Sequence, residues 1–221
     1  MEHDKLTTSQ FNFIGTILSL FSHEMNNHLA IVKNSVGLIG DFIRLGKTSR
    51  KDLQEILKTI QSIENQIEET SYFCDNLSGF GHGMEKPLST FSVHKCVEEL
   101  IILLRRLASQ RRVQLEKNLS VNIPLIHNNP LMLQFLIFCF IEKNLRRLDD
   151  NSKIIIKTTY SNNSIEISII PKGNFIKDEE GICKDEIYQQ LIRQLGGNIS
   201  QKTAGEEITI QLPISQSSAA T

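Results

Sequence analysis

The first 45 residues hold the pattern that most restricts the fold, a long stretch without proline in which apolar residues recur at helical spacing. From Thr7 to Leu45 one set of residues alternates steps of four and three along the chain: Ile14, Leu18, Phe21, Met25, His28, Val32, Ser35, Ile39 and Phe42. This spacing predicts one long helix that packs along a single stripe. We call this set of residues the stripe.

A second helix is predicted directly after the first. Gly46 and Lys47 end the first helix, and Ser49 with Asp52 resembles a capping box that opens the next one. The same rhythm then returns at Leu53, Ile56, Ile60, Ile63, Ile67, Thr70, Cys74 and Leu77. Two long helices joined by a short turn should pack antiparallel as a hairpin.

Apolar residues that lie off the stripe predict a partner for this hairpin. A lone hairpin would leave them exposed to water; they are Ile17, Leu20, Leu29, Ile31 and Leu38. Pairing two hairpins into a four-helix bundle would bury these side chains. We therefore expect a homodimer.

The pattern changes after residue 83. Gly79, Gly81, Gly83 and Pro87 indicate a flexible junction between a first domain, residues 1–83, and a second, residues 84–215, with a disordered tail at 216–221. The second domain is predicted as helix 92–110, strand 113–118, helix 130–147, strands 153–159 and 164–170 joined by a turn at Asn162-Asn163, helix 184–195, and strands 198–202 and 206–212. The fold class is therefore α+β, a long antiparallel helical hairpin followed by a two-layer α/β sandwich.

Composition excludes several classes of function. The net charge of -1 and the pI near 6.6 give no electrostatic case for a nucleic-acid partner. The basic pairs Arg105-Arg106 and Arg111-Arg112 are interpreted as solvated helix faces. The N-terminus lacks a signal-peptide pattern, and the most apolar segment, Leu131–Ile141, is about half the ~20 residues needed to cross a bilayer. We expect a cytoplasmic protein without a membrane partner.

The cysteines predict neither a metal site nor disulfide bonds. They lie far apart and form no Cys-x-x-Cys pair: Cys74, Cys96, Cys139 and Cys183. Reduced thiols are the simpler interpretation.

The most informative residue is His23. The stripe places it on the outer face of the first helix, with Asn27 one turn later on the same side. An outward imidazole can act as a nucleophile toward a phosphoryl group. The neighbouring Glu24 could accept a hydrogen bond from one ring nitrogen and support the imidazolium character that develops. On its own, however, a histidine in a helix is a weak motif.

Four segments together resemble the core of the sensor histidine kinases. His23-Glu24-x-x-Asn27 resembles their H-box, and Asn76–Phe80 resembles the end of the hairpin that carries it; Leu191–Ile199 and Gly205–Pro213 resemble the end of their ATP-binding domain. The resemblance implies that residues 1–83 form the dimerisation and histidine phosphoacceptor hairpin and residues 84–215 an ATPase-fold domain. His28 stands where many members have proline, and its place on the stripe indicates a structural role.

The nucleotide site of that family is degenerate in this sequence. Phe138 and Glu142 stand at the asparagine positions that help hold Mg²⁺, Pro171 replaces the aspartate that reads adenine, and Phe175 replaces a glycine. Only Lys177–Gly181 remains where a lid would lie, and Ile182 and Lys184 replace the glycines of the next motif. We expect no ATP binding and no intrinsic cofactor.

A hairpin with a histidine and a degenerate ATPase domain resembles the histidine phosphotransferases of phosphorelays. The resemblance implies that His23, with Glu24 and Asn27 beside it, carries a phosphoryl group between the aspartates of response regulator receiver domains, which supply the Mg²⁺. Three alternatives remain: a divergent histidine kinase that still uses ATP, a response-regulator phosphatase in which Asn27 orients water, and a non-catalytic protein that sequesters a regulator or inhibits a kinase.

Overall fold

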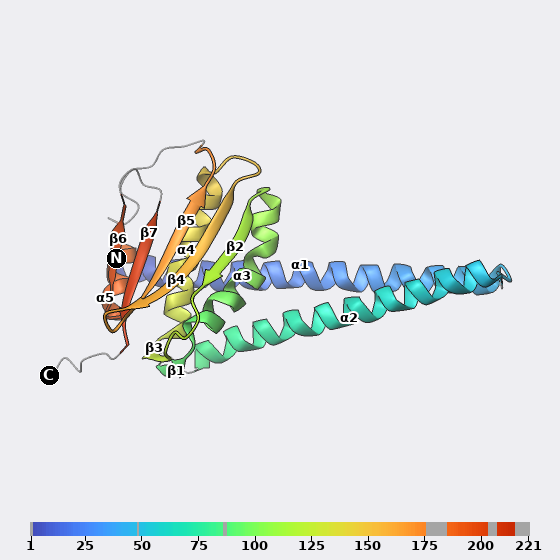
Figure 1. Ribbon diagram of the computed structural model, residues 1–221, viewed down its shortest axis with the longest axis horizontal. Helices are drawn as coiled ribbons and strands as arrows, with labels where there is room; N and C mark the ends of the chain where they lie inside the picture. The colour runs from blue at the N-terminus through green and yellow to red at the C-terminus, as the bar shows by residue number, and fades with distance from the viewer. Residues whose placement is uncertain (1, 48, 86–87, 176–184, 203–206, 215–221) are drawn as a thin grey trace.

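The hairpin is the longest feature of the computed structural model, which describes residues 2–47, 49–85, 88–175, 185–202 and 207–214. Helix α1 (Glu2–Arg44) and helix α2 (Arg50–Glu85) run antiparallel, and their joined ends project beyond the rest of the molecule (Figure 1). At the start of α2 the amide of Asp52 donates to the Ser49 hydroxyl, and the amide of Ser49 donates to the Asp52 carboxylate, each at 3.2 Å. This reciprocal pair confirms the predicted capping box.

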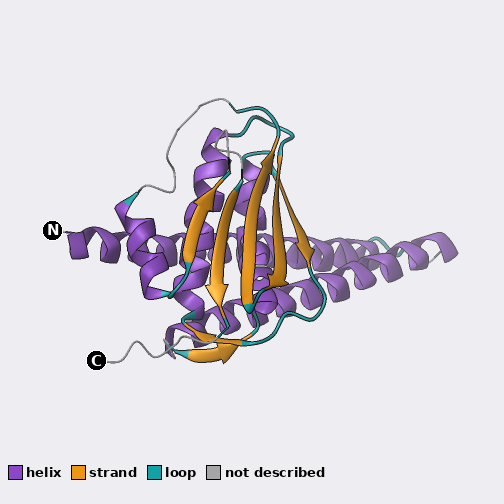
Figure 2. Cartoon of the chain, turned by 60° about the vertical axis from the view of Figure 1, so that its left-hand side comes forward, coloured by secondary structure: helices purple, strands orange, loops and turns teal. Residues whose placement is uncertain are grey.

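The second part of the chain forms a sheet with helices on one face (Figure 2). Its elements are β1 (Ser89–Phe91), α3 (Val93–Gln110), β2 (Gln114–Leu119), β3 (Ile126–Asn128), α4 (Pro130–Arg147), β4 (Lys153–Ser161), β5 (Ser164–Lys172), α5 (Glu186–Gln194), β6 (Asn198–Gln201) and β7 (Ile208–Pro213). The main sheet has the order β2-β4-β5-β7-β6, in which only β2 and β4 pair in parallel. A separate antiparallel pair, β1 and β3, was not predicted. The predicted hairpin followed by an α/β sandwich is confirmed.

The turn between β4 and β5 follows its predicted sequence signal. Asn162 and Asn163 have φ angles of 49° and 60°, and the flanking Ser161 and Ser164 face each other across the ladder. Positive φ angles at both central residues match the twist of a two-residue hairpin. The register set by this turn points alternate residues of both strands toward the helices, where Ile154, Ile156, Ile165, Ile167 and Ile169 are fully buried.

The first half of α1 packs against the second part of the chain. Phe13, Ile17 and Leu20 are buried in the same core as the apolar faces of α3 and α4. The expectation that Ile17 and Leu20 need a second hairpin to cover them is therefore wrong. The physical reason is that α3 and α4 of the same chain pack on this side of α1, next to the stripe, whose residues Ile14 and Phe21 contact the same core.

The prediction that the glycines before residue 84 interrupt the helix is also wrong, whereas Pro87 of the predicted junction lies outside the described residues. Helix α2 continues through Gly79, Gly81 and Gly83 as far as Glu85. A Cβ atom at Gly79 would overlap the carboxylate of Glu99 on α3. The glycine therefore permits close packing of two helices and does not end one of them. The boundary at residues 83 and 84 stays a prediction, and the tail at 216–221 lies outside the described residues.

None of the described helices is long and apolar enough to cross a membrane.

Candidate functional site

His23 and Asn27 occupy the open side of α1. Both side chains are exposed, and one helical turn separates them on the same side. Within the described part of the chain, the side chain of His23 takes part in no hydrogen bond and no ion pair. Its ring nitrogens are therefore available to a molecule that approaches from solvent.

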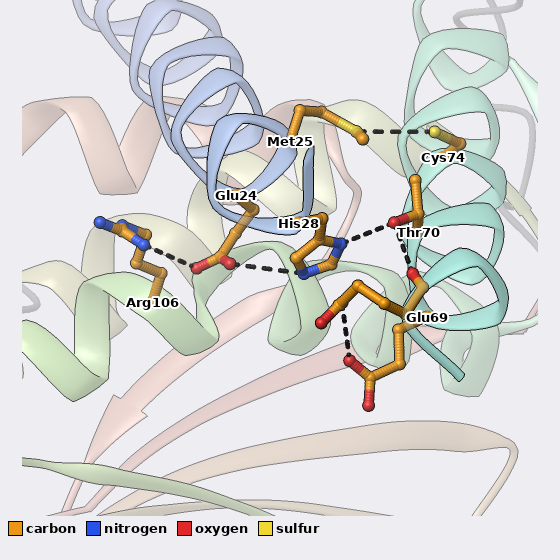
Figure 3. A network of polar contacts seen from close by, with 8 residues as sticks. Glu24, Met25, His28, Glu69, Thr70, Cys74 and Arg106 are labelled. Carbon is orange, nitrogen blue, oxygen red and sulfur yellow. Dashed lines mark hydrogen bonds and ion pairs between the residues drawn. The ribbon is translucent and has the colours of Figure 1, made fainter. Parts of the chain in front are cut away.

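Glu24 points to a different place from the one predicted (Figure 3). Its Oε1 accepts a hydrogen bond from Nη1 of Arg106 at 3.1 Å, and its Oε2 lies 3.7 Å from Nε2 of His28. The predicted hydrogen bond from His23 to Glu24 is not formed. Successive residues of a helix are turned by about 100°, so Glu24 faces α3 while His23 faces solvent.

His28 links α1 to α2. Its Nδ1 lies 2.9 Å from the hydroxyl of Thr70, and that hydroxyl donates its own hydrogen to the carbonyl of Gln66 at 2.7 Å. Thr70 must therefore accept from His28, which places a proton on Nδ1 and leaves Nε2 facing Glu24. The side chain is 15% exposed. These contacts agree with a structural role for His28 between the two helices.

Arg106 is the residue of this network that sequence analysis missed. The prediction of a solvated face for the Arg105-Arg106 pair holds for Arg105 but is wrong for Arg106. The side chain of Arg106 is 24% exposed, and its Nε is buried without a hydrogen-bond partner among the described residues. Arg106 follows Ile102 by four residues and Leu103 by three, so it shares the apolar side of α3. This spacing is the sequence signal that distinguishes Arg106 from the exposed Arg105.

A cleft of about 530 Å³ opens beside this network, between the hairpin and α3. Aromatic and aliphatic side chains form part of its wall, and charged groups from all three helices reach it; the lining includes Glu24, His28, Glu69, Tyr72, Phe73, Ile102, Arg105 and Arg106. The Glu24 carboxylate is therefore close to solvent in the cleft. His23 lies on a different face of α1 and does not line this cleft.

Phe138, which stands at one of the asparagine positions of the kinase family, lies in an aromatic cluster. Phe138 on α4 is 5% exposed, and its ring centroid lies 4.7 Å from that of Phe13 on α1. Phe13 also contacts Phe135 and Phe80, with ring centroids 5.4 and 5.5 Å away. The first half of α1 thus covers this face of α4. An aromatic cluster offers no oxygen ligand to Mg²⁺, so these residues do not fit the metal.

One turn further along α4, Glu142 is engaged with its own helix. Its carboxylate accepts from Arg146 at 2.6 Å. Burial, together with the charge of Glu142, raises the pKa of the nearby Cys139 thiol to about 12. This thiol therefore supplies no thiolate nucleophile. Among the described residues, no group of three or more His, Cys, Asp or Glu side chains is placed to hold a metal ion.

The adenine-reading position is likewise part of the core. Pro171 is buried in β5 opposite Ile154, and the ring of Phe175 lies 4.9 Å from the guanidinium of Arg147. Neither residue offers the carboxylate or the open glycine turn that a nucleotide requires. Within the described part of the chain, these two positions therefore do not fit the adenine of a nucleotide. Lys177–Gly181, Ile182 and Lys184 lie outside the described residues.

Comparisons with known proteins identify the fold. The sequence matches no protein-family model and no curated protein. Among solved structures, Acinetobacter baumannii histidine kinase AdeS matches with a TM-score of 0.50 and 16% identity, over 88% of this chain and 98% of the AdeS chain. Full-length ShkA, solved in complex with AMPPNP, matches with a TM-score of 0.50 and 10% identity, over 91% of this chain and 46% of that one. The chain has the fold of a histidine kinase core, a helical hairpin followed by an ATPase-type sandwich.

Proposed function

We propose that this chain is a histidine phosphotransfer protein that relays a phosphoryl group between the aspartates of two response regulators through His23. The observation that carries the proposal is a contrast within one fold. His23 is open to solvent on a hairpin of the histidine kinase type. The face of α4 that serves the nucleotide in that family is filled by Phe13 and Phe138. A histidine without a usable ATP site needs another phosphoryl donor.

The chemistry of the relay requires little from this chain besides position. The unprotonated nitrogen of neutral His23 attacks the phosphorus of an aspartyl phosphate; a P–N bond forms, the P–O bond breaks, and the aspartate leaves as a carboxylate. The reverse step on a second receiver domain returns the imidazole. Docking supplies the in-line geometry, and the Mg²⁺ in the acidic pocket of the regulator offsets the phosphoryl charge. The chain itself needs no cofactor.

We also propose that two chains pair through their hairpins into a four-helix bundle. Large apolar residues repeat every seven positions on the open faces: Leu29, Val36 and Ile43 on α1 are 61, 56 and 69% exposed. On α2, Leu53, Ile60 and Ile67 are 51, 39 and 53% exposed. A repeat of seven is the spacing of helices that pack side by side. A second copy offers the same repeat in return.

The proposal is tested by offering the protein two phosphoryl donors. A phosphorylated receiver domain from the same pathway should label the chain, whereas MgATP alone should not. Calorimetry with MgATP should show no heat of binding at about 1 mM, where a site worth ~4 kcal/mol would be half filled. Saturable binding, or label transferred from ATP alone, would instead support the divergent histidine kinase.

A response-regulator phosphatase is the second candidate, because Asn27 is exposed on the same side as His23. An amide there could orient a hydrolytic water against a docked aspartyl phosphate. Asn27→Ala should then slow the loss of phosphate from the regulator while His23 is labelled at the normal rate. A non-catalytic regulator is distinguished by His23→Ala, which in that case would leave sequestration or inhibition unchanged.

A further inference from the structure

Glu24, the carboxylate next to His23, makes its contacts away from His23. Both oxygens of Glu24 face other partners, Arg106 at 3.1 Å and His28 at 3.7 Å. The two contacts come from different elements, since Arg106 lies on α3 and His28 on α1 itself. While the hydrogen bond to Arg106 holds, Glu24 does not contact His23.

A released Glu24 would act on His23. The two residues are adjacent on α1, and a glutamate side chain can turn from one helix face toward the next. A carboxylate that accepts from one imidazole nitrogen leaves the other nitrogen as the nucleophile and stabilises the positive charge that grows on the ring. The same carboxylate cannot serve Arg106 and His23 fully at the same time.

Water and open space adjoin the contact between Glu24 and Arg106. The side chains of Glu24 and Arg106 are 25% and 24% exposed, so water competes for both groups. Nε of Arg106 is buried without a partner, which leaves the guanidinium only partly satisfied. The cleft beside the pair gives the side chains space to move.

We propose that Arg106 is a positioning residue that holds Glu24 on the α3 side and thereby lowers the rate at which His23 exchanges phosphate. The second domain controls phosphotransfer in this way without contacting His23. This inference rests on the proposed function, because the rate in question is that of His23 labelling.

The first test needs no phosphotransfer, so it separates the inference from the proposed function. ¹⁵N NMR of the His23 ring reports which nitrogen carries the proton. Arg106→Gln should shift the balance of the two neutral tautomers, because the freed Glu24 accepts from one nitrogen. Arg106→Met, which keeps the unbranched stem, is a second release variant and should do the same. The matched control is Arg105→Gln, since Arg105 is exposed on the same helix.

The second test measures labelling of His23 by a phosphorylated receiver domain. Both release variants should raise the initial rate about fivefold, with receiver affinity unchanged. Arg105→Gln should leave the rate as it is. In the double variant Glu24→Gln/Arg106→Gln the gain should vanish, which a merely structural role of Arg106 would not predict.

Each outcome decides the matter. An unchanged tautomer balance in folded Arg106→Gln and Arg106→Met protein would overturn the inference, whatever the function is. A shifted balance with no gain in labelling would show that the contact does not set the rate, and would also overturn it. If no receiver domain labels the wild type although the tautomer balance shifts, the proposed function fails and the positional hold of Arg106 on Glu24 stands.

Discussion

The two halves of the hairpin carry the same kind of apolar sequence but differ in what covers it. In the near half, Ile17 and Leu20 lie off the stripe and are 0% and 7% exposed, because α3 and α4 pack on them. In the far half, Leu29 and Leu38 lie off the stripe and are 61% and 49% exposed. The chain therefore covers the apolar side chains at one end of the hairpin and leaves those at the other end open to solvent. Covering the other end requires another molecule.

The candidate site lies where these two halves meet. His23 and Asn27 follow the last buried residue of the near half, Leu20, and precede Leu29. Glu24 on the inner side still reaches α3 through Arg106. The site is therefore held by the second domain on one side and open to a docking protein on the other.

The largest expected effect concerns the near half. Ile17→Ala should lower the free energy of unfolding by about 2–5 kcal/mol, since it removes a fully buried side chain from a shared core. Phe11→Ala is the control in the same half of α1, where Phe11 is 69% exposed. The control should change the free energy by less than about 0.5 kcal/mol in urea titrations. Equal losses of unfolding free energy in Ile17→Ala and Phe11→Ala would mean that packing on α3 and α4 does not distinguish the Ile17 face of α1 from the Phe11 face.

The next effect concerns the far half and the proposed dimer. Ile60→Glu should raise the dissociation constant of the dimer about a hundredfold, because it places a charge in an apolar contact. Gln61→Glu adds the same charge at the adjacent position, which is outside the repeat of seven, and should have little effect. Sedimentation at micromolar concentration measures both. A wild-type protein that sediments as a 25.1 kDa monomer would contradict the dimer itself.

The smallest effect comes from Glu99, a buried charge on α3 that packs against Gly79 of α2. Burial raises the pKa of Glu99 above its ordinary value near 4.5, while Lys95 and Gln134 partly oppose this shift. A raised carboxyl pKa means that the folded state binds more protons than the unfolded state, so stability falls as the pH rises above about 4.5. Glu99→Gln should therefore raise the melting temperature at pH 7. The corresponding gain in the free energy of unfolding should be no more than about 1 kcal/mol.

The pH dependence provides the control for this prediction. Below pH 4.5 both the wild type and Glu99→Gln are neutral at this position, so their melting temperatures should converge. A gain that is constant from pH 4 to pH 7 would show that the charge of Glu99 is not its cause.

Local signals predicted the elements well. The heptad-like rhythm predicted both long helices, Ser49 with Asp52 predicted the start of α2, and Asn162-Asn163 predicted the tight turn. Each of these signals acts within a few residues, where sequence spacing and physical contact are nearly the same thing. The short pair β1 and β3 escaped prediction because three-residue strands carry almost no alternation.

Long-range contacts could not be predicted from the same signals. Periodicity predicts that Ile17 is covered but cannot name the covering element, which is the second part of this chain and not a second hairpin. Gly79 indicated a break because nothing nearby in sequence shows that Glu99 packs against it. The ion pair of Glu24 with Arg106 spans 82 positions in the sequence. Helical spacing could place Arg106 on the apolar side of α3 but could not name its partner.

Mapping of the phosphate after incubation with a phosphorylated receiver domain decides whether His23 carries the phosphoryl group. The account predicts an acid-labile, base-stable label on His23, as expected for a phosphoramidate. The label should be absent in His23→Ala and present in folded His28→Ala. Glu24→Gln should be labelled more slowly, because an amide that leaves Arg106 and turns to His23 cannot offset imidazolium charge. A label on His23→Ala equal to that of the wild type, with every receiver domain that labels the wild type, would contradict the account.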